Sequence, residues 1–184
     1  SSTYLQLSNN IETVANALYD LGVRRTNRVA WLGHNRPLAI EMLLACSRLG
    51  AIYLPLNSRL TVAEHQWILN DATPTVLVAD TDFREQANAA LIASELKVSA
   101  EAELYVASPS APRTGASNDD VLLAYTSGTT GRPKGAVLTQ KALVANAVNA
   151  THAHDFSSHD RVLTLLPLFH VGGLNIQTLP ALFA

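Results

Sequence analysis

The chain has 184 residues, of which 48% are hydrophobic and only 15% charged, with a formal net charge of −2 and a pI near 6.3. Such a chain suits one domain or a large piece of one, and without a block of Lys or Arg it offers no electrostatic basis for binding nucleic acid. No apolar stretch reaches the roughly 18 residues of a membrane span, and the single Cys46 excludes an internal disulfide, so a cytoplasmic location is expected.

Helical and strand patterns alternate through the first part of the chain. Four helices are expected, at residues 9–22, 37–50, 61–70 and 82–96. Four short strands are expected, at residues 29–32, 51–56, 75–79 and 104–107. Asn9 with Glu12, and Thr61 with Glu64, are the polar caps from which two of these helices are expected to begin. Strands separated by helices of this length indicate an α/β fold with a mainly parallel sheet, covered by helices on both faces.

A loop containing Ser, Pro and Gly at residues 108–119 leads into the second part of the chain. Apolar runs at residues 121–124 and 136–138 are expected to be neighbouring strands joined without a helix. Three further elements are expected, namely a helix over residues 143–150 capped by Thr139, a strand at 161–166 and a helix at 174–183.

The connection between those two neighbouring strands is the most informative segment. Residues 125–135 read Tyr-Thr-Ser-Gly-Thr-Thr-Gly-Arg-Pro-Lys-Gly, with three glycines, four Ser or Thr side chains and one lysine. Glycines let successive backbone N–H groups turn toward an anion, and hydroxyl and ammonium groups add donors, so the pattern is typical of a phosphate-binding loop. It matches neither the Walker-type loop nor the dinucleotide-binding loop, whose glycines are spaced differently. The alternative interpretation is a flexible polar hairpin turn.

This segment resembles the phosphate-binding signature of the AMP-forming acyl-CoA synthetases, in the adenylate-forming superfamily. The resemblance runs along nearly the whole chain. It is carried further by Thr3-Tyr4 with Leu7, Ala15, Leu18 and Leu21-Gly22-Val23, by Arg28-Val29-Ala30 with Asn35, by Leu49-Gly50-Ala51 and Pro55-Leu56-Asn57 with Arg59 and Glu64, and by Pro167-Leu168-Phe169-His170-Val171-Gly172-Gly173. It implies that the chain is part of the large N-terminal domain of such an enzyme.

The resemblance implies that ATP activates a small-molecule carboxylic acid as an acyl-adenylate, which is then transferred to coenzyme A, with Mg²⁺ as a further cofactor. The residues implied to bind the ATP phosphates are Thr126, Ser127, Gly128, Thr129, Thr130, Gly131, Lys134 and Gly135. Lys134 is expected to contact the β- and γ-phosphates and so to act in catalysis. The alternative for Lys134 is an exposed surface lysine.

His170 is implied as the second catalytic residue, and His170, Val171, Gly172 and Gly173 as substrate-binding residues of the acyl pocket. The alternative for His170 is a core histidine. Residues 168–171 hold no acidic side chain to pair with an ammonium group, and Asn57 stands where amino-acid-activating members of the superfamily usually carry Asp. Both features favour a fatty or aryl acid. The other two hypotheses are an amino-acid-activating adenylation domain and a non-catalytic nucleotide-binding or interaction module.

The resemblance also implies an incomplete domain. We expect residues 1–184 to be an N-terminal AMP-binding domain that is truncated at both ends and lacks the C-terminal lid domain, so that the groups for Mg²⁺ and coenzyme A lie mainly elsewhere. On this interpretation the 184 residues alone do not complete the reaction, and their exposed apolar surface predicts self-association or a homo-oligomer. His152, His154 and Asp155 suggest a metal site, but a solvated helix end is the favoured interpretation and no metal site is predicted.

Overall fold

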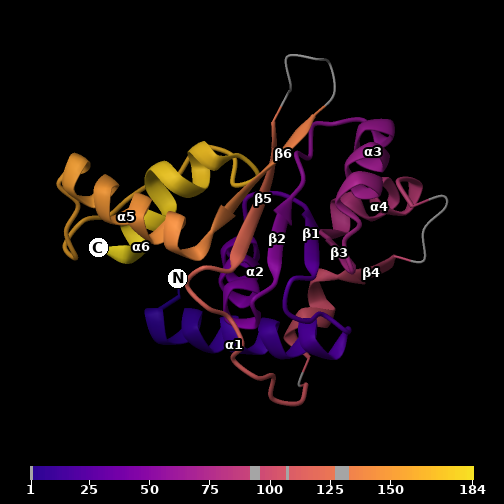
Figure 1. The fold of residues 1–184 in the computed structure, drawn as a ribbon, viewed down its shortest axis with the longest axis horizontal. Helices are drawn as coiled ribbons and strands as arrows, with labels where there is room; N and C mark the ends of the chain where they lie inside the picture. The colour runs from indigo at the N-terminus through magenta and orange to yellow at the C-terminus, as the bar shows by residue number, and fades with distance from the viewer. Residues whose placement is uncertain (1, 92–95, 107, 127–132) are drawn as a thin grey trace.

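The centre of the molecule is a six-stranded sheet, seen in a computed structural model that describes residues 2–91, 96–106, 108–126 and 133–184 (Figure 1). The strands are β1 (Arg28–Leu32), β2 (Ile52–Pro55), β3 (Val76–Ala79), β4 (Lys97–Ala100), β5 (Asp120–Thr126) and β6 (Lys134–Thr139). They lie in the order β4-β3-β1-β2-β5-β6. Every neighbouring pair is parallel except β5 and β6, which form an antiparallel hairpin. The predicted mainly parallel α/β fold is confirmed.

The helices begin and end where the local chemistry requires. They are α1 (Tyr4–Asp20), α2 (Pro37–Leu49), α3 (Val62–Ala72), α4 (Arg84–Ala89), α5 (Gln140–His154) and α6 (Leu179–Phe183), with short 3₁₀ segments η1 (Thr81–Phe83) and η2 (Glu101–Tyr105) and the π-helical turn η3 (Gly172–Thr178). The ring of Pro37 fits the first turn of α2, and Gly50 ends that helix with a φ of 68°. The predicted capping box of Thr61 and Glu64 opens α3.

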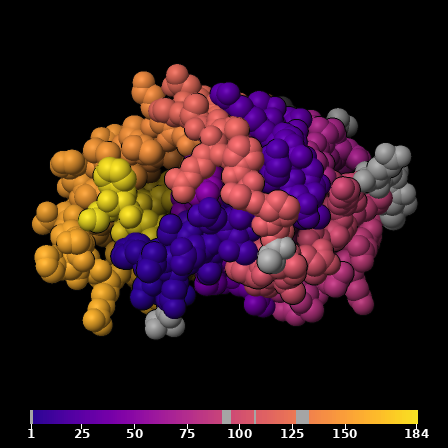
Figure 2. Space-filling model, turned by 90° about the horizontal axis from the view of Figure 1, so that it is seen from below, coloured from indigo at the N-terminus to yellow at the C-terminus, as the bar shows by residue number. Residues whose placement is uncertain are grey.

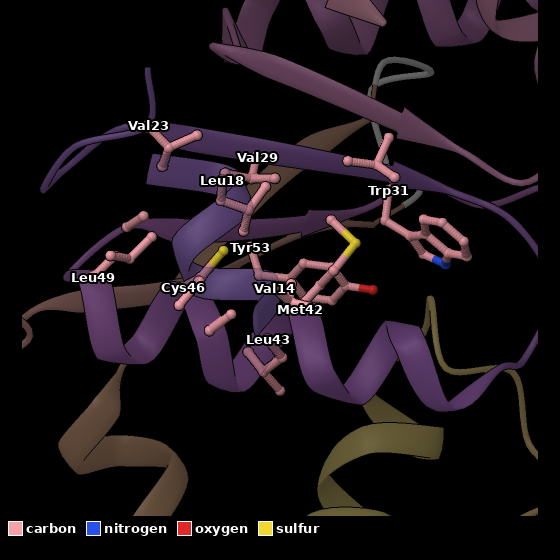
Figure 3. Close-up of a cluster of buried hydrophobic side chains, with 14 of the residues drawn as sticks. Val14, Leu18, Val23, Val29, Trp31, Met42, Leu43, Cys46, Leu49 and Tyr53 are labelled. Carbon is pink, nitrogen blue, oxygen red and sulfur yellow. The ribbon is translucent and has the colours of Figure 1, made fainter. Parts of the chain in front are cut away.

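Both faces of the sheet are buried, because successive side chains of a strand point to opposite faces. Val29 and Trp31 of β1 pack with α1 and α2, whereas Ala30 and Leu32 pack with α3 and α4. Figure 3 shows the first of these two cores. Cys46 lies in the same core, and burial raises the pKa of its thiol, so it is a buried and unreactive cysteine.

A further helical layer, α5 and α6, lies beside β6 (Figure 1). Figure 2 shows the C-terminal helix, in yellow, against the N-terminal helix, in indigo. Tyr4 and Leu7 of α1 line an apolar hollow of about 300 Å³ together with Leu179 and Leu182. Within the described ranges no helix is both long and apolar enough to cross a membrane.

The first helix and the fourth strand lie elsewhere than the sequence predicts. The first helix begins at Tyr4 rather than near residue 9, because Thr3 and Gln6 form a capping box upstream of the predicted one. The strand predicted at residues 104–107 is wrong, because the fourth strand is β4, at Lys97–Ala100, and residues 104 and 105 belong to η2. Tyr105 turns its hydroxyl toward Glu41 of α2 at 2.5 Å, which holds η2 against the helices rather than in the sheet.

Two other elements are shorter than predicted or absent. Helix α4 covers only part of the segment predicted at residues 82–96, of which residues 92–95 lie outside the described part of the chain. The strand predicted at residues 161–166 is wrong, since this segment belongs to no strand of the described sheet. Leu163 and Leu165 there are 73% and 78% exposed, so the apolar pattern meets no neighbouring strand that would complete a hydrogen-bonded ladder.

Candidate active site

The β5–β6 hairpin presents Thr126 and Lys134 side by side at the end of its ladder that adjoins the connecting loop. They are the last pair in the ladder, both side chains are exposed, and the Thr126 hydroxyl lies 3.5 Å from the carbonyl oxygen of Lys134. Ser127, Gly128, Thr129, Thr130 and Gly131, the remaining predicted loop residues, lie outside the described residues. The structure therefore brings together a hydroxyl and a cation at the two edges of the predicted phosphate-binding loop.

Gly135 is fixed by close packing rather than by an unusual backbone angle. It pairs with Tyr125 in the ladder, and a Cβ atom there would lie 2.7 Å from Leu123 Cδ1 and 3.3 Å from Tyr125 Cζ. A larger residue would push the Tyr125 ring or the Leu123 side chain out of place. This close packing explains why the last residue of the motif, next to Lys134, is a glycine.

Tyr125 connects this hairpin to helix α3. Its hydroxyl donates to Asp71 Oδ2 at 2.5 Å, and its ring meets Trp67 edge to face, with ring centroids 6.1 Å apart. The sequence analysis missed Asp71, because nothing in the residues around it indicates a partner 54 positions further along the chain. Trp67 is a packing residue, partly buried against the core beneath α3.

Asn35 holds the segment that leads to His170. Its amide nitrogen donates to the carbonyl oxygen of Leu166 at 2.9 Å, and its amide oxygen accepts from the backbone N–H of Leu168 at 2.8 Å. Asn35 lies in the turn after β1, so one side chain joins the end of a central strand to a segment more than 130 residues away. The role of Asn35 is therefore to position this segment.

The turn around His170 is tight and held by its own backbone. His170 is exposed, and its Nδ1 accepts from the N–H of Gly172 at 3.1 Å. A Cβ atom on Gly173 would lie 2.3 Å from the carbonyl oxygen of Pro167, a backbone clash that leaves room only for glycine. Val171 is half-buried. The four predicted acyl-pocket residues therefore form one compact turn, and in the described part of the chain no hydrogen bond joins this turn to the hairpin that carries Lys134.

A hollow of about 580 Å³ opens at the carboxyl ends of β1 and β2. Asn35, Arg59 and Phe169 are among its lining residues, and the Arg59 guanidinium carbon lies 5.9 Å from the centre of the Phe169 ring. Phe169 rather than its neighbour His170 faces this hollow. Ligands of open α/β sheets bind at this edge of the sheet.

Buried His65 supports the turn that carries Arg59. Its Nε2 lies 2.9 Å from the carbonyl oxygen of Asn57, and its Nδ1 lies 3.2 Å from Nε2 of Gln86, which also donates to the carbonyl oxygen of Leu60 at 2.8 Å. Burial lowers the pKa of His65, although the bond to Asn57 acts in the opposite direction. A neutral ring at this position can accept from Gln86 and donate to Asn57.

His152 and His154 lie exposed at the end of α5, and His152 Nδ1 is 2.8 Å from the carbonyl oxygen of Val148. Across the described residues, no three His, Cys, Asp or Glu side chains gather as they would to hold a metal ion. Both histidines are part of an exposed helix end.

The chain belongs to the AMP-binding enzyme family, whose model matches residues 1–184. It is 44% identical over 196 residues to the indoleacetate–CoA ligase of Aromatoleum aromaticum, an alignment that covers 99% of this chain and 38% of that protein. It is 43% identical over 181 residues to the feruloyl-CoA synthase of an Amycolatopsis species, covering 98% of this chain and 37% of that protein. The crystal structure of ATP-bound MatB from Rhodopseudomonas palustris matches with a TM-score of 0.86 and 30% identity, over 97% of this chain and 38% of that chain.

These matches confirm the resemblance to acyl-CoA synthetases at the level of the family, since the relatives are CoA ligases. The chain spans less than two fifths of the length of each of these three proteins.

Proposed function

We propose that the protein is an ATP-dependent ligase that joins a carboxylic acid to coenzyme A. A carboxylate oxygen attacks the α-phosphorus of ATP, the bond to pyrophosphate breaks, and an acyl-adenylate forms. The sulfur of coenzyme A then attacks the acyl carbon, and AMP leaves. The observation that carries this proposal is the exposed pair of Thr126 and Lys134 at the loop end of a hairpin in a chain of the AMP-binding family.

The contribution of this chain to the first step is to bind and orient the triphosphate. Lys134 supplies a point charge for the β- and γ-phosphate oxygens, and Thr126 a hydroxyl donor, at neighbouring positions of the ladder. Each hydrogen bond to a charged oxygen contributes about 1.5–3 kcal/mol, so a few of them suffice to hold the phosphates in line for attack. Residues 127–131 are proposed to add backbone and hydroxyl donors, and Mg²⁺ to neutralise further charge.

We propose an aryl acid as the substrate. The two relatives named above, at 44% and 43% identity, are called indoleacetate–CoA ligase and feruloyl-CoA synthase. Residues 168–171 of this chain offer no carboxylate for a substrate ammonium group. His170 is proposed to contact the reacting carboxylate from its tight turn, with Val171, Gly172 and Gly173 shaping the acyl pocket.

The test is pyrophosphate exchange by the full-length protein with a panel of acids. The panel consists of indoleacetate, ferulate, a long-chain fatty acid and phenylalanine, each with ATP, Mg²⁺ and labelled pyrophosphate. Exchange that depends on an aryl acid, followed by formation of its CoA thioester, is the expected result. Exchange with phenylalanine alone contradicts the aryl-acid proposal, and no exchange with any acid contradicts the ligase proposal itself.

A further inference from the structure

The hairpin that presents Lys134 lies at the border of the sheet. Strand β6 is the last strand in the order, and residues 134–137 are exposed, with Val137 at 50%. An edge strand whose outer residues have few packing partners needs another attachment to hold its end in one place. In the described part of the chain, that attachment runs through Tyr125.

Tyr125 has three partners that fix its side chain. Its hydroxyl donates to Asp71 Oδ2 at 2.5 Å, its ring meets Trp67 edge to face at an interplanar angle of 86°, and the same ring stands over Gly135, where a Cβ would lie 3.3 Å from Cζ. Asp71 and Trp67 both belong to α3. That helix is itself secured by its capping box and by buried Ile68 and other side chains in the core under the sheet.

The path from Tyr125 to Lys134 is short. Tyr125 pairs with Gly135, and the next pair of the ladder is Thr126 with Lys134. A displacement of the Tyr125 ring therefore moves the strand at the position directly beside the lysine. Partial burial, and then the bond to Asp71, raise the pKa of Tyr125, so its hydroxyl stays protonated and keeps donating through neutral and mildly alkaline pH.

We propose that Asp71 and Tyr125 are positioning residues that tie the lysine-bearing end of the hairpin to α3 and so fix the Lys134 ammonium for the ATP triphosphate. This inference rests on the function proposed above. Neither residue touches the reacting atoms, so both act through the placement of Lys134. Gly135 is part of the same arrangement, because a Cβ atom there would lie 2.7 Å from Leu123 Cδ1 and would crowd the Tyr125 ring at 3.3 Å.

The chain contains a matched control for this contact. Tyr105 also donates its hydroxyl to a carboxylate oxygen at 2.5 Å, that of Glu41, but it does so in η2, outside the hairpin. Tyr125→Phe and Tyr105→Phe each remove one tyrosine–carboxylate bond and keep the ring. Comparing the two separates an effect on the hairpin from a general loss of stability.

The experiment measures KM for ATP, kcat and the melting temperature in the full-length protein by acid-dependent pyrophosphate exchange and thermal unfolding. Losing one net hydrogen bond of about 1 kcal/mol from the placement of Lys134 corresponds to roughly a fivefold rise in KM for ATP. Tyr125→Phe is expected to show this rise with KM for the acid unchanged, and Tyr105→Phe to leave KM for ATP at the wild-type value. Asp71→Ala should reproduce Tyr125→Phe, whereas Asp71→Asn, which keeps an oxygen acceptor, should recover most of the loss.

Equal KM values for ATP in the two tyrosine variants overturn the inference, as does an Asp71→Asn variant that is as impaired as Asp71→Ala. Failure of the inference is distinguishable from failure of the proposed function. A wild-type protein that exchanges pyrophosphate, with ATP kinetics unmoved in Tyr125→Phe, removes only the positioning role. A wild-type protein that exchanges with none of the acids removes the ligase assignment.

Discussion

Asn35 offers a prediction whose size follows directly from the structure. The side chain makes two hydrogen bonds to the segment before His170, one to the exposed carbonyl of Leu166 and one from the partly buried N–H of Leu168. Net contributions of about 0.5 and 1 kcal/mol for these bonds give a local loss of roughly 1.5 kcal/mol in Asn35→Ala. The Leu168 amide then opens more often, and its hydrogen exchange should become about tenfold faster.

The assay is native-state amide hydrogen exchange of the full-length protein, followed at residues 166–170. Asn35→Asp is the control, because it keeps an acceptor for the Leu168 N–H and loses only the donor to Leu166, so its exchange should change less than that of Asn35→Ala. The kinetic counterpart is a higher KM for the acid with KM for ATP unchanged. Exchange at Leu168 as slow in Asn35→Ala as in the wild type would refute the bridging role.

Three further predictions concern other residues of the site and its supports. His170→Ala should alter the ranking of acids in pyrophosphate exchange while ATP affinity stays the same, and equal losses for every acid together with lost ATP binding would indicate a packing role instead. His65 is buried with a lowered pKa, whereas in the unfolded chain it titrates near 6.5, so the unfolded state takes up the proton first and stability should fall as the pH drops below that value. His65→Gln should show a weaker fall between pH 7 and pH 5 in thermal unfolding, and an identical fall would contradict this. Thr139→Ala removes the hydroxyl that accepts from the Ala142 N–H at 3.2 Å and should destabilise the protein by about 1 kcal/mol, with Thr139→Ser close to wild type in urea unfolding.

The alternation of helices and strands could be predicted because the strands are buried on both faces. A run such as Val29–Leu32 is continuously apolar only when helices cover both sides of the sheet, and both cores are present. The hairpin of β5 and β6 was predictable for a related reason, since two apolar runs are separated by glycine-rich sequence with no helical pattern. The start of α3 was also predictable, because Thr61 and Glu64 form a capping box that the sequence shows directly.

The contacts that build the candidate site could not be predicted, because they join residues far apart in the chain. Asn35 bonds to residues 166 and 168, and Tyr125 bonds to Asp71. These bonds depend on which elements become neighbours in the fold, and a local sequence pattern does not contain that information. At residues 161–166 the local pattern was present but the predicted strand did not form. Its apolar residues satisfy the pattern, but a strand also requires a partner, and the described sheet provides none there.

The most direct test of the account is equilibrium binding of ATP to the full-length wild type, Lys134→Ala and Lys141→Ala. Lys141 is an exposed lysine at the start of α5 and carries the same charge away from the hairpin end. Loss of a charge-assisted contact of about 1.5–3 kcal/mol predicts that Lys134→Ala weakens ATP binding at least tenfold, while Lys141→Ala binds as the wild type does. ATP binding of Lys134→Ala that equals that of Lys141→Ala would contradict the claim that the end of this hairpin binds the triphosphate.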